Sequence, residues 1–388
     1  MEKKNRTITF IYYDSVQKMV FELIGKKAVE HGYNIKFTSN KFEKCDIGFY
    51  CEHINHPENS NFSIIMLHDI TQQYLNWPDI WFREPWNKYD IGFLPSEKWK
   101  SNWINSSDKF YSKPSKGCYV VGWPKADSFS NFNIIEKQTF FKSKFGLNMD
   151  KKTILYAPAW ENDGKQDDFV KSMLKLDVNI LIKQAPWVKK DYPKIVKNIE
   201  EMKALHENIP NVFILDAKVN IMEAICACDV LVSEESSTMC EAVMLGRPAV
   251  SVSNWLIPDT TPKRFPSDTY EFAVKTKKEN LTSTIEEILL HYDSFADKAK
   301  KWSSIYFGNF TNTCAKMIEI LDEVLATGKP TKESLVPKIE TTISKKELLA
   351  FNREQKRRNR IDRISSCLVG RFFLKCFYKI KKIFKVKK

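Results

Sequence analysis

Short apolar runs alternate with amphipathic stretches along the first third of the chain. The runs carry β-branched and aromatic side chains and predict six strands, at residues 7–13, 34–38, 46–51, 63–68, 90–94 and 118–122. Residues 16–31 repeat their apolar positions at helical spacing and end before Gly32, which predicts an amphipathic helix. Strands that alternate with helices indicate a mostly parallel, doubly wound sheet.

The same alternation starts again after a predicted helix and polar turn near residues 131–150. It predicts five more strands, at residues 153–156, 178–182, 212–215, 230–232 and 249–252. Two consecutive α/β units of similar size predict two Rossmann-like, doubly wound domains that face each other across a cleft. Residues 281–325 have helical periodicity, and residues 327–344 hold one glycine and two prolines, which is typical of a linker.

Most of the net charge lies in a C-terminal tail. The chain has 388 residues, of which 43% are apolar, enough for two domains, and its net charge is +13. Residues 353–388 hold fourteen lysines and arginines against Glu354 and Asp362, and they therefore carry +12 of this charge. The nearly neutral remainder argues against a basic groove for DNA or RNA. We expect domains at residues 1–135 and 136–326, a linker at 327–352 and the tail at 353–388.

The end of the tail combines apolar and basic positions at helical spacing. The apolar side chains recur at steps of three and four residues, at Leu368, Phe372, Cys376, Phe377, Ile380, Ile383 and Phe384. Lysines and Arg371 fall between them, which predicts a basic amphipathic helix that lies on an anionic membrane surface. Two alternatives stay open: the helix packs back on the protein, or it binds a partner or nucleic acid through its charge. Because the tail lacks a base-reading fold, we do not expect nucleic acid as a partner.

The cysteines and the N-terminal sequence bear on where the protein works. The nine cysteines form no CxxC pair, which indicates reduced thiols in a cytosolic protein without a disulfide framework or a metal site. The first residues lack the pattern of a secretory signal, and no window of eighteen uncharged apolar residues occurs. We expect a cytoplasmic protein that is peripheral on the inner face of the cell membrane.

Residues 229–253, DVLVSEESSTMCEAVMLGRPAVSVS, contain the most informative polar loop. A predicted strand leads into Ser236 and Ser237, and a helix begins at Thr238. Hydroxyl groups and free backbone N–H groups at a helix N-terminus favour an anionic pyrophosphate. In the alternative interpretation, the two serines only cap the helix and Glu241 completes a capping box.

Residues 153–164, TILYAPAWENDG, form a strand that Pro158 ends. Trp160 then lies at the carboxyl end of the strand, where an open α/β sheet usually binds its ligand. Pro158 and Trp160 are therefore candidate donor-binding residues, although the indole could also be only a rim aromatic.

Residues 62–71, FSIIMLHDIT, bring His68 and Asp69 to the end of another buried strand. A histidine there can remove a proton from an acceptor hydroxyl, because its ordinary pKa near 6.5 suits proton transfer near neutrality. The alternative is a structural histidine. We take His68 and Asp69 as the candidate catalytic residues.

Three stretches, GWPKAD, TILYAPAW and DVLVSEESSTMCEAVMLGRP, resemble in order and spacing the CDP-glycerol glycerophosphotransferase family of teichoic-acid and capsule synthesis. The resemblance covers about residues 60–255. It implies a GT-B fold with the active site between two Rossmann-like domains, the N-terminal one for the acceptor and the second for the nucleotide donor. It also implies transfer of a glycerol or ribitol phosphate from a CDP-activated donor to a hydroxyl of a lipid-linked glycan or cell-envelope polymer.

The resemblance also implies roles for particular residues. His68 matches the histidine thought to act as base, and Ser236, Ser237 and Glu241 match positions that hold the phosphates and the polyol or ribose of the donor. No cofactor and no metal is implied, because hydroxyl, histidine and helix-dipole groups can meet the pyrophosphate charge.

The sequence departs from the family pattern at two positions. Asp69 replaces the glycine that normally follows the histidine, and Ala185 replaces the histidine of an Arg-x-His-Pro motif, so that Lys183 is the candidate for the missing charge. Two other functions stay open: a GT-B glycosyltransferase that uses a nucleotide-sugar donor for surface polysaccharide synthesis, and a non-catalytic membrane-bound scaffold of the same fold.

Overall fold

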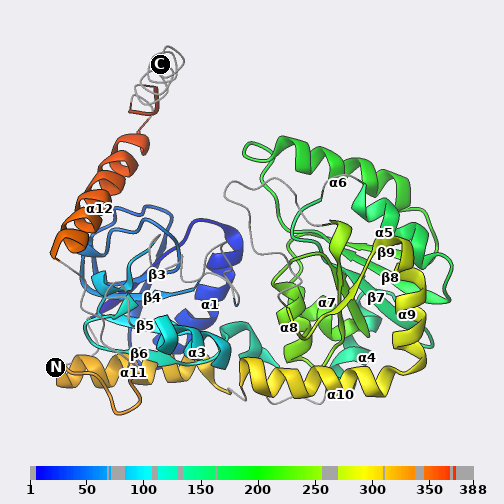
Figure 1. Ribbon diagram of the computed structural model, residues 1–388, viewed down its shortest axis with the longest axis horizontal. Coiled ribbons are helices and arrows are strands. Elements are labelled where there is room, and N and C mark those ends of the chain that lie inside the picture. The colour runs from blue at the N-terminus through cyan, green and yellow to red at the C-terminus, as the bar shows by residue number, and fades with distance from the viewer. Residues whose placement is uncertain are drawn as a thin grey trace.

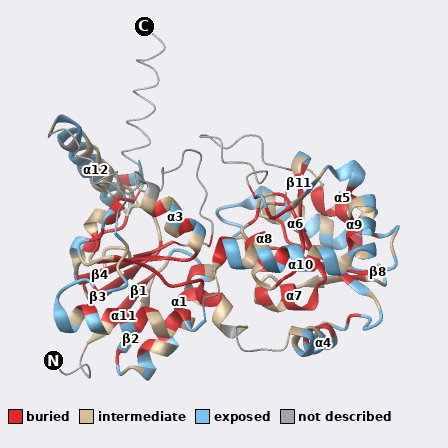
Figure 2. Cartoon of the chain, turned by 60° about the horizontal axis from the view of Figure 1, so that its bottom comes forward, coloured by how far each residue is buried: buried red, intermediate tan, exposed pale blue. Residues whose placement is uncertain are grey.

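The computed structural model describes residues 6–67, 70, 84–106, 112–129, 134–161, 164–255, 270–308, 311–336, 345–367 and 370–372. Two six-stranded parallel sheets lie side by side, each between layers of helices (Figure 1). The strands of both sheets are largely buried, while the exposed residues lie mainly on helices and loops (Figure 2). The predicted doubly wound α/β architecture is therefore confirmed.

The first sheet has the strand order β2-β1-β3-β4-β5-β6. Its strands are β1 (Thr7–Ile11), β2 (Asn34–Thr38), β3 (Cys45–Tyr50), β4 (Ser60–Met66), β5 (Ile91–Leu94) and β6 (Cys118–Val120). Helices α1 (Ser15–Glu30) and α3 (Glu97–Ser106) belong to this half of the molecule. All six predicted strands are confirmed, with bounds that differ by a few residues.

The second sheet has the order β12-β11-β10-β7-β8-β9. Its strands are β7 (Lys152–Tyr156), β8 (Val178–Lys183), β9 (Val212–Leu215), β10 (Val230–Ser233), β11 (Ala249–Val252) and β12 (Val274–Thr276). Its helices are α4 (Ile134–Lys144), α5 (Lys165–Met173), α6 (Pro193–His206), α7 (Ile221–Ala227), α8 (Thr238–Met244), α9 (Leu281–Leu290) and α10 (Tyr292–Trp302). The five predicted strands are confirmed, and within the described residues the short edge strand β12 is additional. Every residue of β8 is buried, as expected for a parallel strand covered on both faces.

The helical region predicted at residues 281–325 is interrupted. A π-helical turn at Ser303–Phe307 ends at Gly308, whose φ of 80° favours glycine, before α11 (Thr313–Thr327) begins. Helix α11 packs against α1, and the Tyr33 hydroxyl donates to Asp322 at 2.6 Å. Residues 313–327 therefore lie with the first sheet, whereas the predicted division counted most of them with the second domain.

The segment predicted as a linker also contacts the first half. The backbone N–H of Leu335 donates to the carbonyl of Cys118 on edge strand β6 at 2.8 Å. Helix α12 (Lys345–Ser365) begins inside the predicted linker, and its Asp362 accepts a hydrogen bond from Nε2 of the buried His56 at 2.9 Å. The chain beyond residue 372 lies outside the described residues, so the amphipathic tail helix stays a prediction. Within the described ranges, no helix combines the length and the apolar character that crossing a membrane requires.

Candidate functional site

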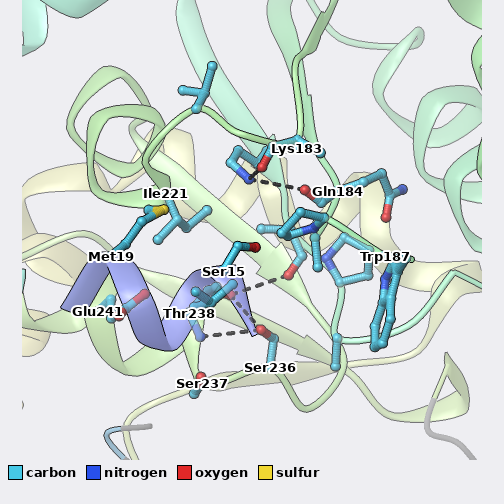
Figure 3. Close-up of a pocket in the computed structure, with 18 of the residues that line it drawn as sticks. Ser15, Met19, Lys183, Gln184, Trp187, Ile221, Ser236, Ser237, Thr238 and Glu241 are labelled. Carbon is cyan, nitrogen blue, oxygen red and sulfur yellow. Dashed lines mark hydrogen bonds between the residues drawn. The ribbon is translucent and has the colours of Figure 1, made fainter. Parts of the chain in front are cut away.

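A cavity of about 550 Å³ lies where the carboxyl ends of the second sheet face the amino end of α1. From the first half, Ser15 and Met19 of α1 and Lys125 line it. From the second half, the segments that follow β7, β8, β9 and β10 line it (Figure 3). The carboxyl edge of a parallel sheet is the expected place for a ligand, since the connecting loops open there.

The structure gathers most of the predicted donor-binding residues in this cavity. Its lining includes Pro158, Lys183, Ser236, Ser237, Thr238 and Glu241. Trp160 does not line the cavity, but its ring stacks on Trp187, which does, with a centroid distance of 4.5 Å. His68 and Asp69 lie outside the described residues.

The serines of the polar loop do not form the predicted alternative, a capping box. Ser237 is the N-cap of α8 but makes no side-chain capping hydrogen bond, whereas the Ser236 hydroxyl accepts from the hydroxyl and from the backbone N–H of Thr238, at 2.9 and 3.3 Å. The Glu241 carboxylate instead accepts hydrogen bonds from the side chains of Trp123 and Lys125. Because α8 has only seven residues, its dipole is small, and most of the positive charge of the site must come from side chains.

A buried ion pair joins the two halves at the cavity wall. Lys125 Nζ and Trp123 Nε1 each donate to Oε1 of Glu241 at 2.9 Å, and the Lys125 ammonium and the Glu241 carboxylate are both buried. Glu241, which the resemblance predicts to bind the donor, lines the cavity and at the same time fixes Lys125 through this oxygen. Lys125 was not predicted as a site residue, although it lies in the GWPKAD turn that carries part of the resemblance.

The GWPKAD turn is held by its aspartate. Both carboxylate oxygens of Asp127 accept hydrogen bonds, from the backbone N–H groups of Thr313 and Cys314, each at 2.7 Å. The carboxylate therefore caps the first turn of α11. This anchor fixes the backbone that presents Lys125 to the cavity.

Lys183 ends strand β8 inside the cavity. Its Nζ donates to the carbonyls of Gln184 and Ala217, each at 3.0 Å. Burial, and then the nearby charge of Lys125, lowers the pKa of Lys183 to about 8. Among the described residues no carboxylate pairs with it, so this buried cation favours an anionic ligand.

Behind the lining, a buried carboxylate holds the loop after β7. Oε1 of Glu234 accepts from the backbone N–H groups of Ala159 and Trp160 at 3.0 and 3.1 Å and from Lys165 Nζ at 3.0 Å. The Glu234 and Lys165 side chains are 0% and 2% exposed. The loop that presents Pro158 therefore has a fixed conformation.

A second buried carboxylate lies next to it. Glu161 accepts hydrogen bonds from the Tyr156 hydroxyl, the Gln184 side chain and the backbone of Gln166, at 2.7–3.0 Å. Burial raises the pKa of Glu161. In the part of the chain that the structure describes, no group of three or more His, Cys, Asp or Glu side chains could hold a metal ion.

Comparison with known proteins agrees with this geometry. The family model described as CDP-glycerol:poly(glycerophosphate) glycerophosphotransferase matches residues 81–307, more than half of the chain. A variant of the wall teichoic acid polymerase TagF, soaked with CDPG, is similar with 16% identity and a TM-score of 0.59, over 84% of this chain and 90% of that chain. Another TagF structure gives 16% identity and a TM-score of 0.58 over the same shares. No curated protein sequence matches. The similarity to TagF shows a GT-B-like fold.

Proposed function

The chain belongs to the CDP-glycerol:poly(glycerophosphate) glycerophosphotransferase family, and from this premise we propose that it transfers glycerol or ribitol phosphate from a CDP-activated donor to a hydroxyl group of a membrane-linked glycan or cell-surface polymer. Membership makes the chain an enzyme of this family. The identity of the polyol and of the acceptor is the proposal.

One observation carries the proposal: two buried lysines from opposite halves of the molecule meet in one cavity with a cluster of hydroxyl groups. Lys183 supplies positive charge that no carboxylate of the described residues balances, Lys125 adds an ammonium group that is paired with Glu241, and Ser236, Ser237 and Thr238 supply hydroxyl groups. A CDP-linked polyol carries its negative charge on a central pyrophosphate. Preorganised cations and hydroxyl groups of this kind bind the pyrophosphate and stabilise the charge that develops on the leaving group.

The reaction we propose is direct displacement at phosphorus. An acceptor hydroxyl oxygen attacks the phosphorus atom of the polyol phosphate, in line with the leaving group, and a new O–P bond forms. The P–O bond to CMP breaks, and its electron pair leaves with CMP. We assign removal of the hydroxyl proton to His68, with Asp69 beside it in sequence, and neutralisation of the charge on CMP to Lys125 and Lys183.

We also propose where each partner binds. The acceptor is assigned to residues 1–135 and the donor to residues 136–326, while the basic tail at 353–388 holds the cytoplasmic enzyme on anionic lipid at the inner face of the membrane. The full chain is then expected to sediment with vesicles that contain anionic lipid and to stay in the supernatant with neutral vesicles. Sedimentation that does not depend on lipid charge would contradict the assignment of the tail.

A thermal-shift panel tests the donor. CDP-glycerol, CDP-ribitol, CMP, UDP and UDP-sugars are added to the purified protein, since a ligand that binds only the folded state raises the unfolding temperature by mass action. We expect the cytidine compounds to raise it. A shift with uridine compounds alone would indicate a glycosyltransferase, and no shift with any compound would indicate a non-catalytic scaffold.

The role of His68 needs a separate test. The substitution His68→Ala is expected to abolish transfer while the thermal shift with CDP-glycerol is retained, because a general base acts on the acceptor and not on donor binding. Unchanged turnover in this variant would remove His68 from the mechanism.

A further inference from the structure

Helix α12 is held on the first half of the molecule by a buried contact near its carboxyl end. Oδ2 of Asp362 accepts a hydrogen bond from Nε2 of His56 at 2.9 Å, and Oδ1 of Asp362 pairs with the ammonium group of Lys41. The side chains of His56 and Asp362 are 0% and 11% exposed. Separating a buried, hydrogen-bonded carboxylate from its partners is costly, so this end of α12 is fixed on the first half.

Further contacts surround the His56 ring. Nδ1 of His56 lies 3.0 Å from Oε1 of Glu58, and the same oxygen accepts a hydrogen bond from Arg363 of α12 at 3.2 Å. The ring packs against Phe42 with a centroid distance of 4.5 Å. Two successive residues of α12 are therefore tied to one histidine of the first half. We call the group of polar side chains the α12 contact: Lys41, His56, Glu58, Asp362 and Arg363.

The outward side of α12 carries positive charge without negative charge. The exposed residues within 349–364 include five cations and no acidic residue. The two acidic residues of this range are engaged elsewhere: Asp362 is in the α12 contact, and Glu354 accepts hydrogen bonds from two arginines. The cations recur at helical spacing and therefore lie on one side of the helix. We call them the basic face: Arg353, Lys356, Arg357, Arg360 and Arg363.

Most of the charge of the basic face is not balanced by the protein. In the part of the chain that the structure describes, no carboxylate pairs with Arg353, Lys356 or Arg360. The other two cations pair with carboxylates that are 39% and 46% exposed. Exposed pairs of this kind contribute little to stability, so they do not hold these arginines firmly. An anionic surface therefore meets at least three available cations on one side of the helix.

Apolar side chains at the ends of the basic face indicate which anionic surface it meets. Leu349 and Ile364 continue the same helical spacing and are 49% and 39% exposed, and Phe372 beyond the helix is 66% exposed. In the sequence, residues 373–388 add seven lysines and no acidic residue. At an anionic bilayer, cations meet the lipid headgroups while apolar side chains enter the boundary with the acyl chains. A soluble polyanion has no such apolar layer.

We propose that the basic face of α12 lies on an anionic bilayer and that the α12 contact thereby holds the first half of the molecule at the membrane. Helix α12 lies beside β3 and β4 of the first sheet, and the second half lies on the other side of α1 (Figure 1). A hollow of about 240 Å³ joins the basic face to the surface of the first half, and it is lined by Phe42, Asn59, Arg363 and Ser366.

This inference rests on the proposed function and names the partner and the orientation of one part of it. The proposed acceptor is linked to the membrane, and its binding is assigned to the first half. A helix that is fixed on this half and lies on the bilayer brings the acceptor side of the cavity near the lipid. A flexible tether would anchor the enzyme without orienting it.

Vesicle sedimentation of the full chain, without nucleotide or acceptor, tests the basic face. The vesicles contain phosphatidylglycerol and phosphatidylcholine in equal parts, or phosphatidylcholine alone. The triple variant Arg353→Gln/Lys356→Gln/Arg360→Gln is expected to bind the anionic vesicles at least about tenfold more weakly than the wild type, because each cation near anionic lipid adds to the attraction.

A matched control removes the same charge from the second half. Three exposed lysines of α6 are replaced by glutamine in this control, and it should bind the anionic vesicles like the wild type. The substitutions are Lys194→Gln, Lys197→Gln and Lys203→Gln.

Hydrogen–deuterium exchange with and without anionic vesicles tests the α12 contact. We expect vesicles to slow exchange in α12 and in residues 40–44, which include Lys41, and to leave α6 unchanged. Asp362→Ala should keep its vesicle affinity within about twofold, because the basic face is intact, but vesicles should no longer slow exchange in residues 40–44. Lys41→Ala leaves His56 paired and provides a second variant should Asp362→Ala fail to fold.

Several outcomes would overturn the inference. Equal affinity of the wild type and the α12 triple variant for anionic vesicles is one, and slower exchange in α6 in place of residues 40–44 is another. Inorganic polyphosphate tests the other class of partner: if the triple variant loses polyphosphate binding but keeps vesicle binding, the basic face binds a soluble polyanion. No binding of the wild type to anionic vesicles would overturn the assignment of the tail as well. The thermal shift with cytidine compounds is measured separately, so failure of the donor proposal and failure of this inference are distinguishable.

Discussion

Each half of the molecule uses one buried glutamate to hold the loop after a strand. In the second half, Glu234 accepts from the N–H groups of Ala159 and Trp160. In the first half, Glu84 accepts from the N–H groups of Ile54 and Asn55 at 2.5 and 3.2 Å, in the loop after β3. The two carboxylates are 0% and 1% exposed, so desolvation is similar at both sites.

The partners of the two glutamates differ. Glu234 pairs with Lys165, which is itself 2% exposed, whereas the cation near Glu84 is Lys88, which is 22% exposed. The Glu84 loop contains Ile54 at a φ of 60°, a left-handed conformation that a β-branched residue rarely adopts, and the two hydrogen bonds offset that strain. Glu234 therefore neutralises a buried positive charge, whereas Glu84 stabilises a strained backbone conformation.

The loops also differ in what they present. Pro158 and Ala159 of the Glu234 loop line the cavity, while residues 51–56 do not line it within the described part of the chain. A buried glutamate that holds a loop therefore supports ligand binding in the second half and stability in the first. Substitution of each glutamate is therefore expected to have separable effects on stability and on donor binding.

The largest effect is expected for Glu234→Ala. The substitution leaves the buried Lys165 ammonium without its partner, and breaking a buried ion pair in this way costs about 3–5 kcal/mol. It also frees the loop with Pro158, so we expect the thermal shift with CDP-glycerol to disappear. Denaturant unfolding gives the stability, and the thermal shift gives the binding.

A companion substitution of both partners, Glu234→Gln with Lys165→Met, should recover part of the stability. A full loss of stability in that double variant would contradict the assignment to the unpaired charge.

The second effect is expected for Glu84→Ala. The loss of two backbone hydrogen bonds and of the Tyr89 hydroxyl bond at 2.6 Å should destabilise the fold by about 2–3 kcal/mol, because the donors stay buried without acceptors. Donor binding should be unchanged, since the loop lies away from the cavity. A smaller thermal shift with CDP-glycerol in this variant, after correction for its lower unfolding temperature, would show that the Glu84 loop also affects donor binding, which contradicts the assignment.

The sequence predicted the strands of both sheets, but it did not predict that the two loops differ in their buried contacts. The strands β7 and β8 each contain three consecutive buried apolar residues, Ile154–Tyr156 and Ile180–Ile182, which is the pattern of a parallel strand buried on both faces. The strand β12 was missed because Val274–Thr276 is short, lies at the edge and is only partly buried. Hydrophobic pattern therefore predicted the longer strands, including the partly buried β2, and failed where a strand is both three residues long and only partly buried.

The side-chain contacts of the site were less predictable for a different reason. Glu241 and Lys125 are 116 positions apart and meet only because the two halves face each other. The family resemblance gave Glu241 a contact with the donor and gave Lys125 no role, and the structure places both side chains at the cavity wall. Trp160 was likewise a candidate by itself, while the rings it packs against, Trp187 and Tyr192, come from the segment after β8.

The smallest predicted effect is a pH dependence of donor affinity. It is expected from Lys183, which no carboxylate of the described residues pairs, and not from Lys165, which is paired with Glu234. A bound pyrophosphate favours the charged form of Lys183, so donor affinity should be highest below pH 8 and fall above it. At pH 9 we expect a loss of up to about tenfold, or about 1.4 kcal/mol. The pyrophosphate diester of CDP-glycerol does not titrate in this range, so the change belongs to the protein.

The stability of the free protein should change in the opposite direction. The pKa of Lys183 is about 8 in the folded state, below the ordinary value of 10.5 that applies when the chain is unfolded, so the unfolded state binds more protons between these two values. Folding stability should therefore rise with pH across this window while donor affinity falls.

The measurement is the unfolding temperature with and without CDP-glycerol at pH 7 and 9, in the wild type and in Lys183→Met. The variant should lose most of the affinity at both values and should lack the pH dependence. If its affinity instead falls between pH 7 and 9 as steeply as that of the wild type, the titrating group is not Lys183, and the cation that binds the donor lies elsewhere in the cavity.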